Sequence, residues 1–165
     1  MKEYRVAILT VSDKGSRGER EDLSGLTVQE EVSGKGWIVV ARDISPDETE
    51  DIEAKLKYYC DELGADLVLT TGGTGLSPRD VTPEATRRVI DREAPGFAEA
   101  MRAASLRVTP HAMLSRAVSG IRASTLIINL PGSPRAVREN LEVILPALPH
   151  GLEKLRGEEG ECATP

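Results

Sequence analysis

Short apolar runs alternate with amphipathic stretches along most of this sequence. The runs have the length of buried strands in a parallel sheet, and they occupy residues 5–11, 37–41, 66–69 and 124–130. The stretches between them carry apolar residues at helical spacing and occupy residues 24–33, 46–63, 83–92 and 134–148. This alternation predicts an α/β fold with a largely parallel central sheet and helices on both faces, in a single three-layer domain.

Three further segments complete this prediction. Residues 115–122 alternate loosely, which favours an edge or antiparallel strand, and Phe97, Met101 and Ala104 mark the inner face of another helix. The length of 165 residues fits one domain, which we expect to span residues 1–156. Residues 157–165 are small and polar, and we expect a disordered tail there.

Serine and threonine residues before prolines predict where several helices begin. Ser45 is expected to cap a helix that has Pro46 in its first position and Glu48 in its third, which would put Asp47 in the first turn. Thr82 before Pro83 has the same pattern.

Ser133 before Pro134 repeats this capping pattern at a later helix. Arg135 and Arg138 follow it, although cations oppose the dipole at a helix N-terminus. This conflict favours an anion site at Gly132 and Ser133 over a plain turn.

Charge and composition exclude several classes of protein. A net charge of −6 argues against a nucleic-acid surface, so an anionic ligand must be held by local groups. No apolar run approaches the length of a membrane span or of a signal-peptide core, so we expect a cytoplasmic protein with no membrane partner. Cys60 and Cys162 form neither a disulfide framework nor a metal-ligand spacing, and Cys60 shares the apolar stripe of a helix.

The glycine-rich stretch 70–83 is where we expect the chemistry. It follows a short apolar strand, and Gly72, Gly73 and Gly75 allow positive φ angles and the close approach of an anion. Asp80 and a helix start come next. The stretch lacks the lysine of a P-loop, so a tight turn and a ligand loop are both open from this motif alone.

Four polar loops leave the carboxyl ends of the predicted strands, where proteins of this fold class bind their ligands. They are the loops at Ser12–Asp13, at Asp47, at residues 72–80 and at residues 129–133. The stretch 12–22 is either a solvated loop or a lid that faces the ligand. His111 lies in a connecting segment, where packing is the more common role for a lone histidine. The convergence of polar loops favours an anionic-ligand site.

Asp47 and Asp80 would share this cleft. Two carboxylates beside a phosphate cradle are suitable ligands for Mg²⁺, which also takes substrate phosphate oxygens. No nucleophile triad and no zinc-binding cluster stands out. The residues therefore favour phosphoryl or nucleotidyl transfer, which depends on alignment and charge neutralisation.

The sequence closely resembles the MogA/MoaB family of molybdopterin adenylyltransferases, which act in molybdenum cofactor biosynthesis. The matching stretches are 9–13, 45–47, 71–75 with 79–85, 95–97, 114–116 and 129–133. They extend over nearly the whole chain, and the glycine loop with its Asp80 extension is the most specific of them.

The resemblance implies an activity and a set of site residues. AMP would pass from ATP to the terminal phosphate of molybdopterin, with Mg²⁺, in a homotrimer that has a molybdenum insertase as a possible protein partner. Asp47 and Asp80 match the essential acids. The matching ligand contacts are Ser12, Asp13, Thr71, Gly72, Gly73, Thr74, Gly75, Asn129, Pro131, Gly132 and Ser133.

Two other functions stay open at this stage. Similar domains serve as non-catalytic molybdopterin-binding modules, either MoaB-like or inside scaffold proteins, although the presence of both acids argues against this role. The second alternative is a nucleotide-processing relative with a different phosphate substrate. Within the family, residues 79–83 favour the MogA-like branch, whereas residues 76–78 resemble both branches.

Overall fold

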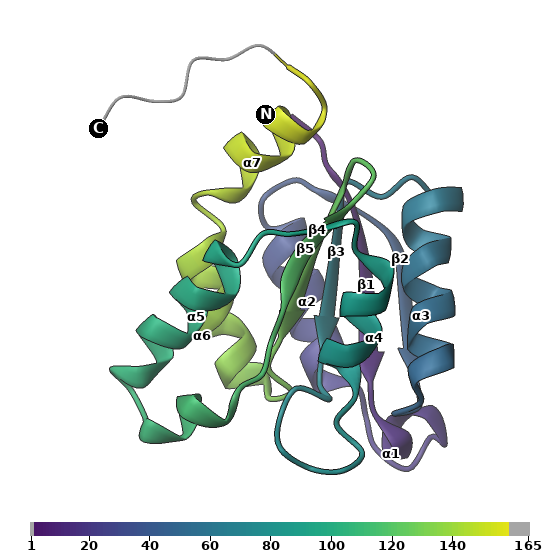
Figure 1. Ribbon diagram of the computed structural model, residues 1–165, viewed down its shortest axis with the longest axis vertical. Helices are drawn as coiled ribbons and strands as arrows, with labels where there is room; N and C mark the ends of the chain where they lie inside the picture. The colour runs from purple at the N-terminus through teal and green to yellow at the C-terminus, as the bar shows by residue number, and fades with distance from the viewer. Residues whose placement is uncertain (1, 159–165) are drawn as a thin grey trace.

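Six strands form one sheet in residues 2–158, the part of the chain that this computed structural model describes. The sheet order is β2-β1-β3-β6-β5-β4 (Figure 1). The parallel strands are β1 (Arg5–Val11), β2 (Ile38–Ser45), β3 (Leu67–Thr71) and β6 (Thr125–Leu130). The antiparallel strands are β5 (Ser119–Arg122) and β4 (Arg92–Glu93). Both the largely parallel sheet and the antiparallel strand within 115–122 are thus confirmed.

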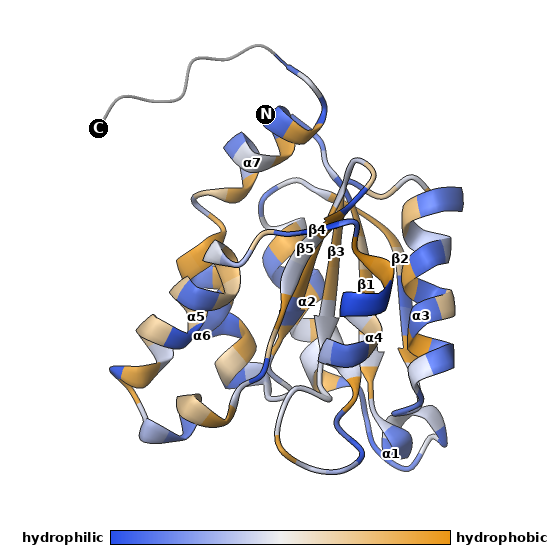
Figure 2. Cartoon of the chain, in the orientation of Figure 1, coloured by the Kyte–Doolittle hydropathy of each residue, from blue (hydrophilic) through white to orange (hydrophobic). Residues whose placement is uncertain are grey.

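Helices cover both faces of this sheet, which confirms the three-layer prediction. One face carries α2 (Leu23–Ser33), α5 (Gly96–Leu106), α6 (Pro134–Ile144) and α7 (Leu148–Leu155). The other face carries α3 (Thr49–Lys57), its π-helical continuation Tyr58–Glu62, and α4 (Thr82–Val89). The outward sides of these helices are mostly hydrophilic, whereas the strands are mostly hydrophobic (Figure 2).

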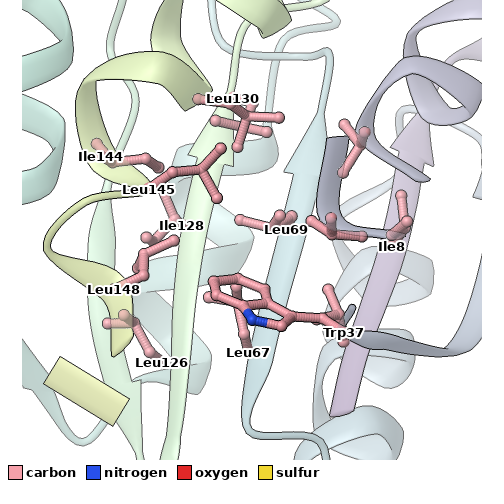
Figure 3. Close-up of a cluster of buried hydrophobic side chains, with 14 of the residues drawn as sticks. Ile8, Trp37, Leu67, Leu69, Leu126, Ile128, Leu130, Ile144, Leu145 and Leu148 are labelled. Carbon is pink, nitrogen blue, oxygen red and sulfur yellow. The ribbon is translucent and has the colours of Figure 1, made fainter. Parts of the chain in front are cut away.

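Alternate residues of each central strand enter one of two apolar clusters, because successive side chains of a strand point to opposite faces. Ile8, Leu69 and Ile128 belong with Trp37 to the cluster on the face that α2, α6 and α7 cover (Figure 3). Their neighbours along the strands, such as Leu9 and Ile127, pack against α3 and α4. Cys60 belongs to the second cluster, as its helical stripe predicts.

The register of the parallel strands brings their carboxyl ends to a common edge. Val11 of β1 pairs with Ser45 of β2, and Thr71 of β3 lies between Thr10 and Leu130. The loops that follow these strands therefore lie together, at the lower end of the molecule in Figure 1, while the N-terminal end of the chain and α7 lie at the opposite end.

The predicted capping box at Ser45 is wrong. Ser45 is the last residue of β2 and is buried, and α3 begins at Thr49 after Glu48, which makes no side-chain cap. Pairing with β1 continues as far as Ser45, and these inter-strand hydrogen bonds outweigh a local helix-start signal. Asp47 therefore lies on a loop before the helix rather than in its first turn.

Other helix boundaries also differ from the sequence pattern. The predicted helix 134–148 is divided after Ile144, since Pro146 and Pro149 lack the N–H groups that a continuous helix needs. The helix predicted to reach residue 92 ends at Val89, because Arg92–Glu93 pair with β5.

Shorter elements lie in the connections. The stretch 12–22 contains the one-turn helix α1 (Asp13–Ser16), which Ser12 caps. His111 is exposed in the 3₁₀ turn Pro110–Leu114, labelled η2.

Within residues 2–158, no helix combines the length and the apolar character that crossing a membrane requires. Of the predicted tail, only Gly157 and Glu158 belong to the described residues, so the expected disorder and Cys162 lie outside them.

Candidate active site

A polar cavity of about 560 Å³ lies at the carboxyl ends of β1 and β3. This is a switch point of the sheet, because β2 and β3 flank β1 and the helices that follow β1 and β3, α2 and α4, lie on opposite faces. Open α/β sheets bind ligands at such switch points. The cavity wall consists of Thr10, Val11, Ser12, Gly15, Arg20, Glu21, Asp22, Leu23, Ser24, Asp47, Thr71, Gly72, Gly73, Asp80, Gly132, Ser133 and Pro134.

This cavity brings together most of the residues that the sequence singled out. Those that line it are Ser12, Asp47, Thr71, Gly72, Gly73, Asp80, Gly132 and Ser133. The remaining candidates lie outside its wall, and they are Asp13, Thr74, Gly75, Asn129 and Pro131.

Gly72 and Gly73 have the left-handed backbone that only glycine adopts without strain, with φ angles of 96° and 67°. A Cβ added at Gly72 would meet the carbonyl oxygen of Val11 at 2.4 Å, and one at Gly73 would meet Thr82 Oγ1 at 2.3 Å. Thr82 Oγ1 donates to the carbonyl oxygen of Gly72, and Thr82 N to that of Gly73. The expected N-cap role of Thr82 is wrong by one residue, because Val81 occupies that position.

Gly75 differs from these two glycines, since its φ angle is not positive. Its missing side chain instead makes room for Asp80, whose Oδ2 would lie 2.9 Å from an added Cβ. The same Oδ2 accepts a hydrogen bond from Ser77 N at 3.0 Å. The loop between β3 and α4 thus bends back on itself and presents Asp80 to the cavity.

Asp47 is held by a reciprocal pair of hydrogen bonds with Asp13. Asp13 N donates to Asp47 Oδ2 at 2.8 Å, and Asp47 N donates to Asp13 Oδ1 at 3.0 Å. Arg79 donates hydrogen bonds to the Asp13 carboxylate from Nε and Nη2, both at 3.0 Å, and Nη2 also donates to Glu48 Oε1. Three loops are therefore joined around Asp47, whose other oxygen lies 3.3 Å from a Cβ added at Gly73.

The two linked carboxyl groups differ in acidity. Burial raises the pKa of Asp47 above its ordinary value, the carboxylates of Asp13 and Asp80 raise it further, and the N–H of Asp13 opposes the shift. The hydrogen bonds from Arg79 and from the N–H of Asp47 lower the pKa of Asp13. Asp13 is thus the better stabilised anion of the pair.

Asn129 has a structural environment. Its Nδ2 donates to Thr70 Oγ1 and Thr86 Oγ1, both at 3.0 Å, and its Oδ1 accepts from Val118 N at 3.1 Å. The side chain is fully buried and joins β3, α4 and the start of β5. Asn129 and Pro131 also line a second, smaller cavity of about 200 Å³, beside the N-terminal turn of α6 and the inner side of α5.

The N-termini of two helices face the main cavity. Ser133 caps α6 by accepting from Ala136 N, which confirms its predicted role. Arg135 and Arg138, however, pair with Glu139 and with Glu30 and Glu31, so these arginines need no bound anion and do not support one.

Asp22 caps α2, the second helix at this cavity, and it was not among the site residues predicted from the sequence. Its Oδ1 accepts from Gly25 N and Thr10 Oγ1, while its buried Oδ2 has only Arg42 Nε at 3.9 Å among the described residues. An aspartate directly before a helical stripe is a capping signal, and Asp22 stands in that position at the end of the stretch 12–22. The neighbouring wall residues Arg20, Glu21 and Ser24 carried no comparable signal.

Asp47 and Asp80 fit a divalent cation that also takes ligand oxygens. Both line the cavity, and neither forms an ion pair with a described residue, since the nearby arginines bind other acids. In residues 2–158, no three His, Cys, Asp or Glu side chains form a ready-made metal cluster. Two carboxylates match the Mg²⁺ sites in which substrate phosphates complete the shell.

The fold and the cavity define a doubly wound α/β protein with a cavity at its switch point. Residues 7–150 match the family described as "Probable molybdopterin binding domain", and the chain belongs to this family.

Known relatives agree with this assignment over nearly the whole chain. Molybdopterin adenylyltransferase from Helicobacter pylori strain J99 is 45% identical over 159 residues, which cover 95% of this chain and 90% of the relative. The crystal structure of the molybdopterin biosynthesis enzyme MoaB from Thermus thermophilus is 55% identical, with a TM-score of 0.89 over 94% of this chain and 98% of that one. Gephyrin from Dictyostelium discoideum is 44% identical over 91% of this chain, but only 22% of gephyrin is covered.

Proposed function

We propose that this protein is a molybdopterin adenylyltransferase of molybdenum cofactor biosynthesis. It transfers AMP from ATP to the terminal phosphate of molybdopterin and releases pyrophosphate. The observation that carries the proposal is the shared cavity at the switch point, where Asp47 and Asp80 lie beside the main chain of Gly72 and Gly73. Relatives that bear this enzyme name align with 84–95% of the chain at 44–48% identity.

Two adjoining cavities support a reaction with two substrates. The larger one has two acids, a glycine turn and two helix N-termini, which suit a triphosphate. The smaller one has mainly small and apolar walls, from Ala98, Met101 and Ala112 among others, which suit the ring of a pterin. Residues 131–132 separate the two, so the reacting phosphates would meet at this turn.

The reaction requires no strong general acid or base from the protein. An oxygen of the molybdopterin phosphate forms a bond to the α-phosphorus of ATP while the bond from that phosphorus to the β-phosphate oxygen breaks. This nucleophile is largely ionised at neutral pH, because the second pKa of a phosphate monoester is near 6. The chain must therefore align the two phosphates and offset their charge, which the glycine turn and the helix ends can do.

We further propose that Asp47 and Asp80 hold Mg²⁺ as ionised oxygen ligands. When bound, this cation would neutralise charge on the ATP phosphates. The link from Arg79 through Asp13 fixes the Asp47 side chain, and the Ser77 N–H fixes Asp80. The remaining proposed contacts are those that the resemblance supplies, at Ser12, Asp13, Thr71, Thr74, Gly75, Asn129, Pro131, Gly132 and Ser133. The cytoplasmic location, the homotrimer and the insertase partner also rest on the resemblance.

Release of pyrophosphate from ATP, molybdopterin and Mg²⁺ tests this function. We expect release only when both substrates are present. Asp80→Asn should lower the rate at least about 100-fold, because an ionised ligand is lost, while molybdopterin binding stays nearly unchanged. Binding without release by the unmodified protein would favour the role of a non-catalytic molybdopterin-binding module. ATP breakdown without molybdopterin would favour a different phosphate substrate.

A further inference from the structure

Arg116 lies at the base of the loop between β3 and α4 and joins the two ends of that loop. Its Nε donates to the carbonyl oxygen of Gly75 at 2.7 Å, and its Nη2 donates to that of Asp80, also at 2.7 Å. The backbone N–H of Arg116 donates to the carbonyl oxygen of Thr74 at 2.8 Å. One residue thus holds the main chain at the start and at the end of the segment 74–80, at the lower end of the molecule in Figure 1.

Glu84 holds the guanidinium from the other side. This residue lies in the first turn of α4 and forms an ion pair with Arg116 through Nη1, while Nη2 lies 3.4 Å from Glu84 Oε2. The hydrogen bond from Arg116 lowers the pKa of Glu84, so the carboxylate is ionised at neutral pH. Arg116 therefore connects the glycine loop to the helix that follows it.

Arg116 does not line the cavity, so it acts on the site through Asp80. Its hydrogen bond to the carbonyl oxygen of Asp80 fixes the backbone from which the Asp80 side chain projects. Asp80 Oδ2 in turn accepts from Ser77 N, and Asp80 N donates to the carbonyl oxygen of Ser77. A change in the spacing between Gly75 and Asp80 would therefore shift the carboxylate.

We propose that Arg116 is a positioning residue that sets the placement of Asp80 in the cavity, an inference that rests on the proposed function. The planar guanidinium meets two carbonyl oxygens and one carboxylate in a fixed fork. A lysine ammonium is a single point on a flexible stem and cannot reproduce this geometry. Arg116→Lys keeps the charge and removes the fork.

Arg122→Lys is the matched control. Arg122 also joins a carbonyl oxygen, that of Val89, to a carboxylate, that of Asp61, and its side chain is 24% exposed compared with 32% for Arg116. Neither Arg122 nor Asp61 lines the cavity. We expect Arg116→Lys to lower kcat about 10- to 100-fold, as loss of an orienting partner does, to raise the Mg²⁺ concentration for half-maximal rate, and to leave KM for molybdopterin within about twofold.

Arg122→Lys should leave these three quantities within about twofold of the unmodified protein, and Glu84→Gln should show the Arg116 effect in weaker form. Equal losses in the two lysine variants would reduce Arg116 to a general structural role and overturn the inference. A change in KM for molybdopterin with kcat intact would also overturn it.

Hydrogen exchange separates this inference from the proposed function. If the unmodified protein releases no pyrophosphate, the proposed function fails, but the positioning role is still measurable. Arg116→Lys should speed exchange at the amides of Ser77 and Asp80 at least about tenfold, while Arg122→Lys leaves them unchanged. Unchanged exchange in Arg116→Lys would overturn the positioning role by itself.

Discussion

At the residue scale, Asp47 combines two demands that conflict. It faces the cavity as a carboxylate, yet burial and the nearby Asp13 and Asp80 disfavour its charge and raise its pKa. Arg79 neutralises Asp13 rather than Asp47. This arrangement leaves Asp47 available to a cation, at some cost to the stability of the protein alone.

This conflict predicts how the contribution of Asp47 to the stability of the protein depends on pH. A raised folded pKa means that the native state binds more protons, so the stability from this group is present at low pH and declines as pH rises through the folded value. Asp47→Asn should therefore raise the free energy of unfolding at neutral pH by less than about 1 kcal/mol, since solvent screens a half-buried group. The gain should vanish below the ordinary carboxyl range.

Urea unfolding at a series of pH values checks this expectation, with Asp51→Asn, at an exposed carboxyl outside the cavity, measured in parallel. The same Asp47→Asn variant should lose pyrophosphate release at least about 100-fold. A loss of stability at neutral pH would show instead that the Asp47 charge supports the fold.

At the element scale, the turn after β3 depends on glycine for two separate reasons. Gly73 has a left-handed backbone, and its Cα lies against Thr82 at the start of α4. Gly36, in the turn before β2, has a similar φ angle of 76° but nothing within 4 Å of an added Cβ. The two positions separate backbone strain from crowding.

Gly73→Ala and Gly36→Ala should differ accordingly. Each should cost about 1–2 kcal/mol for the left-handed backbone. Gly73→Ala should cost about 1–3 kcal/mol more, because the new methyl group displaces Thr82 from its hydrogen bond to Gly72. Chemical denaturation measures both values, and pyrophosphate release should fall only for Gly73→Ala. Equal destabilisation would mean that the turn adjusts without loss.

At the scale of the whole molecule, one apolar surface stands out between α5 and β5. It consists of Leu106, Val108, Met113 and Leu114, whose relative exposures are 45–71%. This end of α5 and the turn after it include hydrophobic segments at the surface (Figure 2). Contiguous exposed apolar residues commonly mark a contact between proteins, and the homotrimer of the proposed function would cover them.

A charge in this surface tests the homotrimer. Val108→Glu should weaken self-association more than tenfold, because burial of an unpaired charge is unfavourable by more than about 1.4 kcal/mol. Ile38→Glu, at an exposed apolar position on the edge strand β2, is the control. Sedimentation equilibrium measures both variants. A trimer that is unchanged by Val108→Glu would move the interface elsewhere, and a monomeric unmodified protein would end the homotrimer proposal.

The sequence by itself determined the fold class, the core and the edge of the sheet at which the polar loops meet. These features follow from local patterns, because side-chain alternation assigns residues to faces and parallel strands bring their carboxyl ends together. The positions of Asp47 and Asp80 at one cavity followed from that rule. The sequence also predicted the Ser133 cap correctly, since its pattern lies within four residues.

Only the tertiary structure decided which polar groups meet. The hydrogen bond from Arg116 to Gly75 joins residues 41 positions apart, and the one from Asn129 to Thr70 joins residues 59 positions apart. No local pattern encodes such pairs, because they depend on how whole elements pack. The same reason explains the failed capping box at Ser45: strand pairing with β1 was stronger than the signal in its neighbouring residues.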